Sequence, residues 1–157
     1  MVRRWIPPVL TIVATTVLVG GVAASASSPL VLTVDAPGQL SAGEEGELRL
    51  ILCLQNPWYI YAPTGVNEAQ GMIETRVQMR RHDQVQFTEA EFPKAEASGT
   101  FAVLAGENIV VRQPFRVRPR VPEGEYRVRG AVEYQACDGE ICLPPNRVEF
   151  SVVLNIR

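Results

Sequence analysis

The sequence predicts an all-β fold. From Pro29 onward it consists of short segments in which apolar and polar residues alternate, and turn residues separate these segments. No apolar run with helical spacing occurs between Ser27 and Arg157. About eight or nine such segments in a chain of this size favour a two-sheet antiparallel sandwich of the immunoglobulin-like type. A closed β-barrel is the alternative architecture.

The first 26 residues are expected to be an export signal, and residues 27–157 the folded domain. Arg3 and Arg4 provide the positive start, the stretch 6–24 is largely apolar, and the stretch 24–26 offers a small-residue cleavage site. An uncleaved anchor is the alternative, because an apolar run of about 18 residues is near the lower limit for a spanning helix. In both cases we expect the domain to be periplasmic or otherwise extracytoplasmic.

Length and charge narrow the classes of function. The chain has 157 residues with 15 basic and 17 acidic side chains, a net charge of −2. Removing Arg3 and Arg4 makes the balance more acidic, and the sequence shows no stripe of Lys or Arg. We therefore expect one domain and no nucleic-acid partner.

The alternating segments predict the strands in chain order. Leucines at every second position from Leu48 to Leu54 place one face of that strand in the core and Cys53 on the other face. We expect Cys53 to be a buried free thiol. The stretch 92–100 is rich in small and polar residues and is expected to be a surface loop. The predicted strands cover residues 30–34, 48–54, 58–62, 73–79, 85–88, 101–105, 109–117, 125–134 and 148–156.

The cysteine pair Cys137 and Cys142 is the feature that can react. The segments on either side are sequential strands, so the simplest geometry is a β-hairpin with Asp138-Gly139 in its tip and the two sulfurs within disulfide reach. An exported chain favours a disulfide over a metal site. Zinc would need two further ligands, and the single histidine, His82, lies in a polar segment typical of a turn. We expect no metal and no cofactor.

This disulfide can be a structural brace or a redox site. The loop-entropy model gives a ring of about six residues only roughly 2 kcal/mol of stabilisation. Asp138 and Glu140 lie inside the ring, Glu133 lies just before it, and the nearest basic residue in sequence is Arg147. Nothing close in sequence favours a thiolate, so the thiols are expected to react slowly until a partner docks. A structural disulfide remains open at this point.

The segment from Tyr134 to Cys137, together with Cys142 and the following Leu143-Pro144-Pro145, resembles the N-terminal periplasmic domain of the thiol:disulfide interchange protein DsbD, the disulfide bond corrector domain family. The resemblance extends more weakly through the stretch 58–61 and the loop after Phe92-Pro93. It implies an immunoglobulin-like fold and a pair, Cys137 and Cys142, that cycles between disulfide and dithiol. Cys142 is expected to enter the mixed disulfide.

The same resemblance implies supporting residues. Tyr59 and Tyr61, which alternation places on one strand face, match aromatic residues beside the pair, although a contribution to the core is the plainer interpretation. Tyr134 belongs to the cysteine motif. The family's cap loop, which shields the cysteines, corresponds to residues 95–99, where Glu96 retains the acid and the only nearby aromatic is Phe101.

The partners implied are thioredoxin-like redox proteins served by a membrane thiol transporter, and oxidised periplasmic clients such as a disulfide isomerase or a cytochrome c maturation protein. The chain would then be a stand-alone component of a protein-disulfide reductase system, with its electron source on a separate protein. The alternative is an immunoglobulin-like binding module whose disulfide is purely structural. No hydrolase motif such as Gly-x-Ser-x-Gly occurs.

Overall fold

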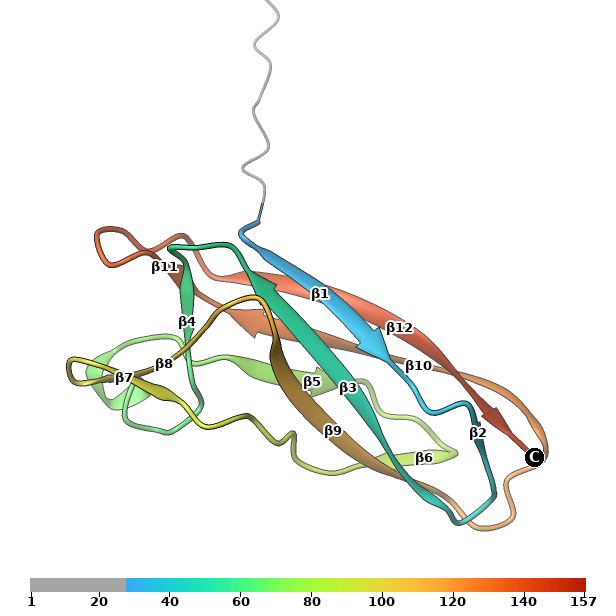
Figure 1. Ribbon diagram of the computed structural model, residues 1–157. Helices are drawn as coiled ribbons and strands as arrows, with labels where there is room; N and C mark the ends of the chain where they lie inside the picture. Colours follow the sequence, from blue (N-terminus) through green and yellow to red (C-terminus); the bar gives the residue numbers. More distant parts are fainter. Residues whose placement is uncertain (1–27) are drawn as a thin grey trace, which may run out of the picture.

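The computed structural model describes residues 28–157 and shows an all-β molecule, an immunoglobulin-like sandwich built from antiparallel sheets (Figure 1). The predicted export signal, residues 1–26, lies outside the described residues. Within the part described, no helix has the length and apolar character needed to cross a bilayer.

Two four-stranded sheets form the body of the sandwich. In the first, the order is β1-β3-β9-β6, and in the second it is β2-β12-β10-β5. All neighbours pair antiparallel except β2 and β12, which run parallel. The bounds are β1 (Leu30–Asp35), β3 (Glu45–Leu54), β9 (Ile109–Val117) and β6 (Val85–Phe87), then β2 (Gln39–Leu40), β12 (Asn146–Ile156), β10 (Gly124–Tyr134) and β5 (Arg76–Met79).

The core lies between these two sheets. Alternate residues of β3 and β9 in the first sheet, and of β10 in the second, point inward and are buried, while β12 contributes the buried Leu154 and Ile156 and the partly buried Val148, Phe150 and Val152. They join one continuous apolar cluster, which includes Leu48, Leu50, Leu52, Val111, Val128, Val132 and Leu154. The period-2 pattern of the sequence therefore reports burial on one strand face, as expected for a sandwich.

A third sheet, ordered β11-β4-β8-β7, lies at the end of the sandwich opposite β2 and the C-terminus (Figure 1). It comprises β11 (Ala136–Cys137), β4 (Tyr59–Tyr61), β8 (Phe101–Ala105) and β7 (Glu96–Ser98). A short 3₁₀ helix, η1 (Glu68–Gln70), lies in the connection from β4 to β5. Strand β11 of this small sheet begins the hairpin that contains both cysteines, and β4 supplies two aromatic residues.

Two expectations from sequence need correction. Part of the predicted 92–100 loop is strand β7, which pairs with β8 through a turn at Gly99. All three β7 residues are exposed, so no alternation of burial marks the strand in the sequence. Cys53 is a free cysteine as predicted, but it is half-buried rather than buried, because it faces outward from the first sheet opposite the exposed Val31.

Candidate functional site

The cysteine segment forms the predicted hairpin. Cys137, at the end of β11, is joined to Cys142 by a disulfide, and the two residues face each other as an antiparallel bridge with Cα atoms 4.1 Å apart. Two backbone hydrogen bonds flank this pair. The N–H of Asp138 donates to the carbonyl of Ile141 at 3.1 Å, and the N–H of Leu143 donates to the carbonyl of Ala136 at 2.8 Å.

The tip of the hairpin is ordered by its own carboxylate. Oδ1 of Asp138 accepts hydrogen bonds from the N–H groups of Ile141 at 2.8 Å and Glu140 at 2.9 Å. These backbone donors stabilise the ionised form, so they lower the pKa of Asp138 below its ordinary value. Gly139 supplies the positive φ of 98° that the turn needs. The tip is thus a defined turn rather than a loose loop.

The two sulfur-bearing residues differ sharply in exposure. Cys137 is 1 % exposed, whereas Cys142 belongs to the exposed class. Next to Cys142, Ile141 is 58 % exposed, one of few large apolar side chains of the described residues that face solvent. A molecule approaching the hairpin therefore reaches Cys142 first.

Aromatic side chains cover Cys137. Cys137 lies directly opposite Tyr59 in the β11–β4 pairing, so both side chains point to the same sheet face. On that face Cys137, Tyr61 and Val103 form a small buried cluster, against which Tyr59, Phe101 and Met72 pack.

Contacts between aromatic rings hold these side chains in place over Cys137. Tyr61 makes edge-on contacts with Tyr59, at a centroid distance of 5.8 Å, and with Phe101, at 5.6 Å. Burial, followed by the neighbouring Tyr59 phenol, raises the pKa of Tyr61 above its ordinary value. Tyr61 is therefore neutral at physiological pH and brings no charge to the sulfurs.

A buried amide holds the loop that carries Met72. The side chain of Asn67 donates to the carbonyls of Ala62 at 2.7 Å and Ala102 at 2.8 Å, and it accepts from the N–H of Ala102 at 2.9 Å. The N–H of Met72 in turn donates to the backbone carbonyl of Asn67. Neither residue was singled out from the sequence, because an Asn in a Gly-rich connection carries no pattern that signals burial.

The two remaining predicted residues, Tyr134 and Glu96, belong to other parts of the fold. Tyr134 is buried in the main core, and its hydroxyl hydrogen bonds with Ser28 and Asn146. Glu96 is an exposed residue of the edge strand β7, paired with Val103. Cys137, Cys142, Tyr59, Tyr61 and Phe101 are thus brought together, and Tyr134 lies in the separate main core. Through its pairing with Val103, which in turn pairs with Tyr61, Glu96 lies on the sheet face that carries the cluster around Cys137.

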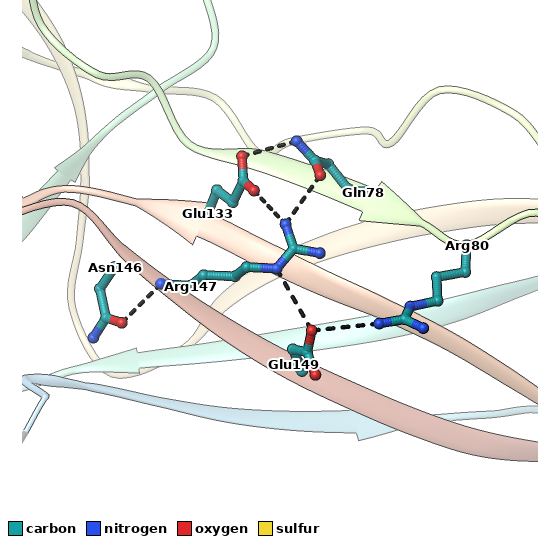
Figure 2. Close-up of polar contacts among 6 residues, drawn as sticks. All are labelled: Gln78, Arg80, Glu133, Asn146, Arg147 and Glu149. Carbon is teal, nitrogen blue, oxygen red and sulfur yellow. Dashed lines mark hydrogen bonds and ion pairs between the residues drawn. The ribbon is translucent and has the colours of Figure 1, made fainter.

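Outside the ring, the charged residues nearest to the cysteines in sequence are Glu133 and Arg147, and they pair with each other on the outer face of the second sheet. Arg147 pairs with Glu133 and Glu149 and also donates to Gln78, and Arg80 shares Glu149 (Figure 2). Within residues 28–157, no ion pair or hydrogen bond links a basic side chain to residues 136–142. The hairpin thus has no paired cation to favour a thiolate.

The described residues contain no cluster of three or more His, Cys, Asp and Glu side chains that would hold a metal ion. The chemistry that this hairpin offers is that of its sulfurs.

Comparison with models of protein families gives no match, and comparison with curated proteins gives none. Among solved structures, the chain is similar to a cohesin module of a family 33 glycoside hydrolase from Clostridium perfringens, with 10% identity and a TM-score of 0.49 over 83% of this chain and all of that one. It is similar to the N-terminal domain of DsbD from Neisseria meningitidis in the reduced form, with 19% identity and a TM-score of 0.36 over 79% of this chain and 85% of that one.

A third similar structure is a family 123 glycoside hydrolase from Clostridium perfringens, with 7% identity and a TM-score of 0.38. The match covers 83% of this chain and 27% of the hydrolase.

Proposed function

We propose that this protein is an extracytoplasmic thiol-disulfide exchange module that relays electrons through Cys137 and Cys142. Its donor would be a thioredoxin-like protein served by a membrane thiol transporter. Its clients would be oxidised periplasmic proteins, such as a disulfide isomerase or a cytochrome c maturation protein. The partner classes and the compartment follow from the resemblance of the cysteine segment to the DsbD N-terminal domain and from the expected export signal.

The observation that carries the proposal is the difference in exposure between the two halves of one disulfide. Cys142 is exposed, and Cys137 is 1 % exposed under the rings of Tyr59 and Tyr61. Attack on a disulfide depends on which sulfur an incoming thiolate can reach. A brace has no need of such asymmetry, whereas exchange with a docked protein gains a defined point of attack.

The chemical steps follow from this geometry. A partner thiolate attacks Sγ of Cys142, the bond to Cys137 breaks, and Cys137 leaves as a thiolate that takes up a proton. The second thiolate of the partner then attacks the partner's own sulfur in the mixed disulfide and releases Cys142. Two electrons and two protons have moved to this protein, and the partner is left as a disulfide. The reverse steps reduce a client.

The cover over Cys137 supports selectivity. In the disulfide form the aromatic cluster keeps Cys137 from solvent, so a small molecule in the medium reaches only the Cys142 side of the pair. Within the described residues no cation is paired with the hairpin, so none is placed there to activate either sulfur. Reaction then depends on a bound partner.

The test is the equilibrium between the disulfide and a thiol buffer. The purified protein is equilibrated with glutathione mixtures and with reduced thioredoxin, and the state of Cys137 and Cys142 is read by alkylation and mass spectrometry. The proposal expects a potential above about −300 mV and reduction by thioredoxin under native conditions. A lower potential, with the bond intact after incubation, would leave a binding module with a structural disulfide.

A further inference from the structure

The backbone at Cys142 faces away from the hairpin. In an antiparallel pair, residues alternate between those that exchange hydrogen bonds and those that do not. Cys137 and Cys142 are of the second kind, because the hydrogen bonds join Asp138 to Ile141 and Leu143 to Ala136 on either side of them. The N–H and C=O of Cys142 therefore point outward, while those of Cys137 point toward Tyr59 of β4.

Cys142 lies outside the named strands and extends the edge of the third sheet by an isolated bridge to Cys137; among residues 141–143 it is the one whose backbone is left open. The neighbouring N–H groups of Ile141 and Leu143 donate to Asp138 and Ala136, and the two neighbouring carbonyls accept from Asp138 and from the side chain of Gln135. Over residues 28–157, no hydrogen bond is made by the N–H or C=O of Cys142. Open donors and acceptors at an exposed sheet edge are a template for another strand.

The sequence after Cys142 limits how such a strand can pair. Pro144 and Pro145 have no N–H to donate, so backbone pairing cannot continue past Leu143. An added strand can therefore pair with the backbone of one residue here, Cys142. The residues that follow, Leu143, Pro144 and Pro145, help to line a hollow of about 200 Å³ that Ser28, Tyr134 and Ala136 also line and that Cys142 does not reach.

We propose that the sheet edge at Cys142 binds an extended backbone segment of the redox partner as an added antiparallel strand, with one partner residue exchanging two hydrogen bonds with Cys142. This inference rests on the proposed function, since the bound segment belongs to the protein whose thiol attacks Cys142.

The surroundings define the chemistry of the segment. Ile141 is 58 % exposed and offers an apolar contact, and the nearby carboxylates of Asp138 and Glu140 favour neutral or basic flanking residues over acidic ones. Because neighbouring strands lie about 4.8 Å apart, pairing at Cys142 holds the partner backbone beside the sulfur that it attacks. The edge thus positions the reaction as well as binding the partner.

The test uses the full-length protein with Cys137→Ser, in a Cys53→Ala background so that Cys142 is the single thiol. Thioredoxin that keeps one active-site cysteine is first activated as an aryl disulfide. The thiolate of Cys142 attacks this disulfide and displaces the aryl thiolate, which gives a stable mixed disulfide. The matched control is the mixed disulfide of the same variant with cysteamine, which has no peptide backbone. Hydrogen exchange of the Cys142 amide is then followed by NMR in both adducts.

The proposal expects Cys142 amide exchange to be at least about tenfold slower in the thioredoxin adduct, the factor that about 1.4 kcal/mol of hydrogen bonding gives. A coupling through the hydrogen bond, from the Cys142 nitrogen to a thioredoxin carbonyl carbon, separates pairing from simple occlusion. The Leu143 amide, already bonded to Ala136, should exchange equally in both adducts.

Equal exchange at Cys142 in the two adducts, with no coupling, would overturn the proposed pairing. Because the adduct is made by chemical activation, this result would leave thiol-disulfide exchange itself untouched. Failure of reduced thioredoxin to open the native disulfide would instead remove the proposed function. Cys137→Ala serves in the same way should the serine variant fold poorly in its buried site.

Discussion

Reduction of the Cys137–Cys142 disulfide is expected to leave the sandwich folded. The ring closed by this bond is small, since the cysteines are only 5 positions apart in sequence. The loop-entropy model gives a ring of about six residues a stabilisation of roughly 2 kcal/mol. Cys137 also belongs to the small aromatic cluster at the end of the molecule, whereas the fully buried leucines of β3 belong to the separate main core.

The magnitude translates into a measurable shift. A loss of about 2 kcal/mol should lower the urea midpoint by about 1 M at a slope of roughly 2 kcal/mol/M. It should lower the melting temperature by roughly 5–10 °C. Unfolding is followed by circular dichroism with and without a phosphine reductant, in the Cys53→Ala background. A loss above about 4 kcal/mol, or unfolding on reduction, would show that the bond is a main support of the fold and would refute this reasoning.

Gly130→Ala should destabilise by about 1–3 kcal/mol in thermal melts, because a Cβ there would lie 2.6 Å from the partly buried side chains of Met79 and Phe150; Gly38→Ala, in open space, is the control. Asn67→Ala leaves buried backbone groups without hydrogen-bond partners, so it should lower the free energy of unfolding by about 1–3 kcal/mol and expose the buried cluster around Cys137. An unchanged melting temperature would contradict this. The pKa of Asp138 is lowered in the fold, so its carboxylate should stabilise the hairpin tip at pH values above its ordinary pKa. As the pH falls and the carboxylate takes up a proton, the hydrogen bond from the Glu140 amide should be lost, and an NMR titration should show this as a change in the Glu140 amide shift.

The longer strands of the two main sheets could be predicted because their burial alternates: the segment 109–117 agrees with β9, and the leucines of β3 all point into the core. The segment 101–105 also agrees with β8 of the third sheet, whereas the two-residue strand β2 was not predicted. The hairpin at Cys137 and Cys142 was also predictable, since it joins two sequential strands through a local turn.

Features that depend on contacts between distant segments could not be predicted. Strand β7 has three exposed residues and is defined by its pairing with β8 alone. The half-buried state of Cys53 depends on how little its neighbour Val31 covers the outer face. Met72 reaches the cluster around Cys137 only because a buried Asn67 holds its loop, and the sequence separates these residues from Cys137 by more than sixty positions.

The unequal exposure of the two cysteines is the feature that the sequence hides most completely. Both lie in the same hairpin, and alternation treats them alike. The difference arises because β4 places Tyr59 and Tyr61 against Cys137 and leaves Cys142 at the free edge.

The identity of the attacked sulfur tests the central claim most directly. The oxidised protein is mixed with a reduced thioredoxin that keeps one active-site cysteine, and free thiols are blocked with N-ethylmaleimide after an acid quench. Peptide mapping then identifies the cysteine in the mixed disulfide. The account predicts thioredoxin on Cys142 and maleimide on Cys137. Thioredoxin attached to Cys137, or a disulfide that stays closed, would contradict it.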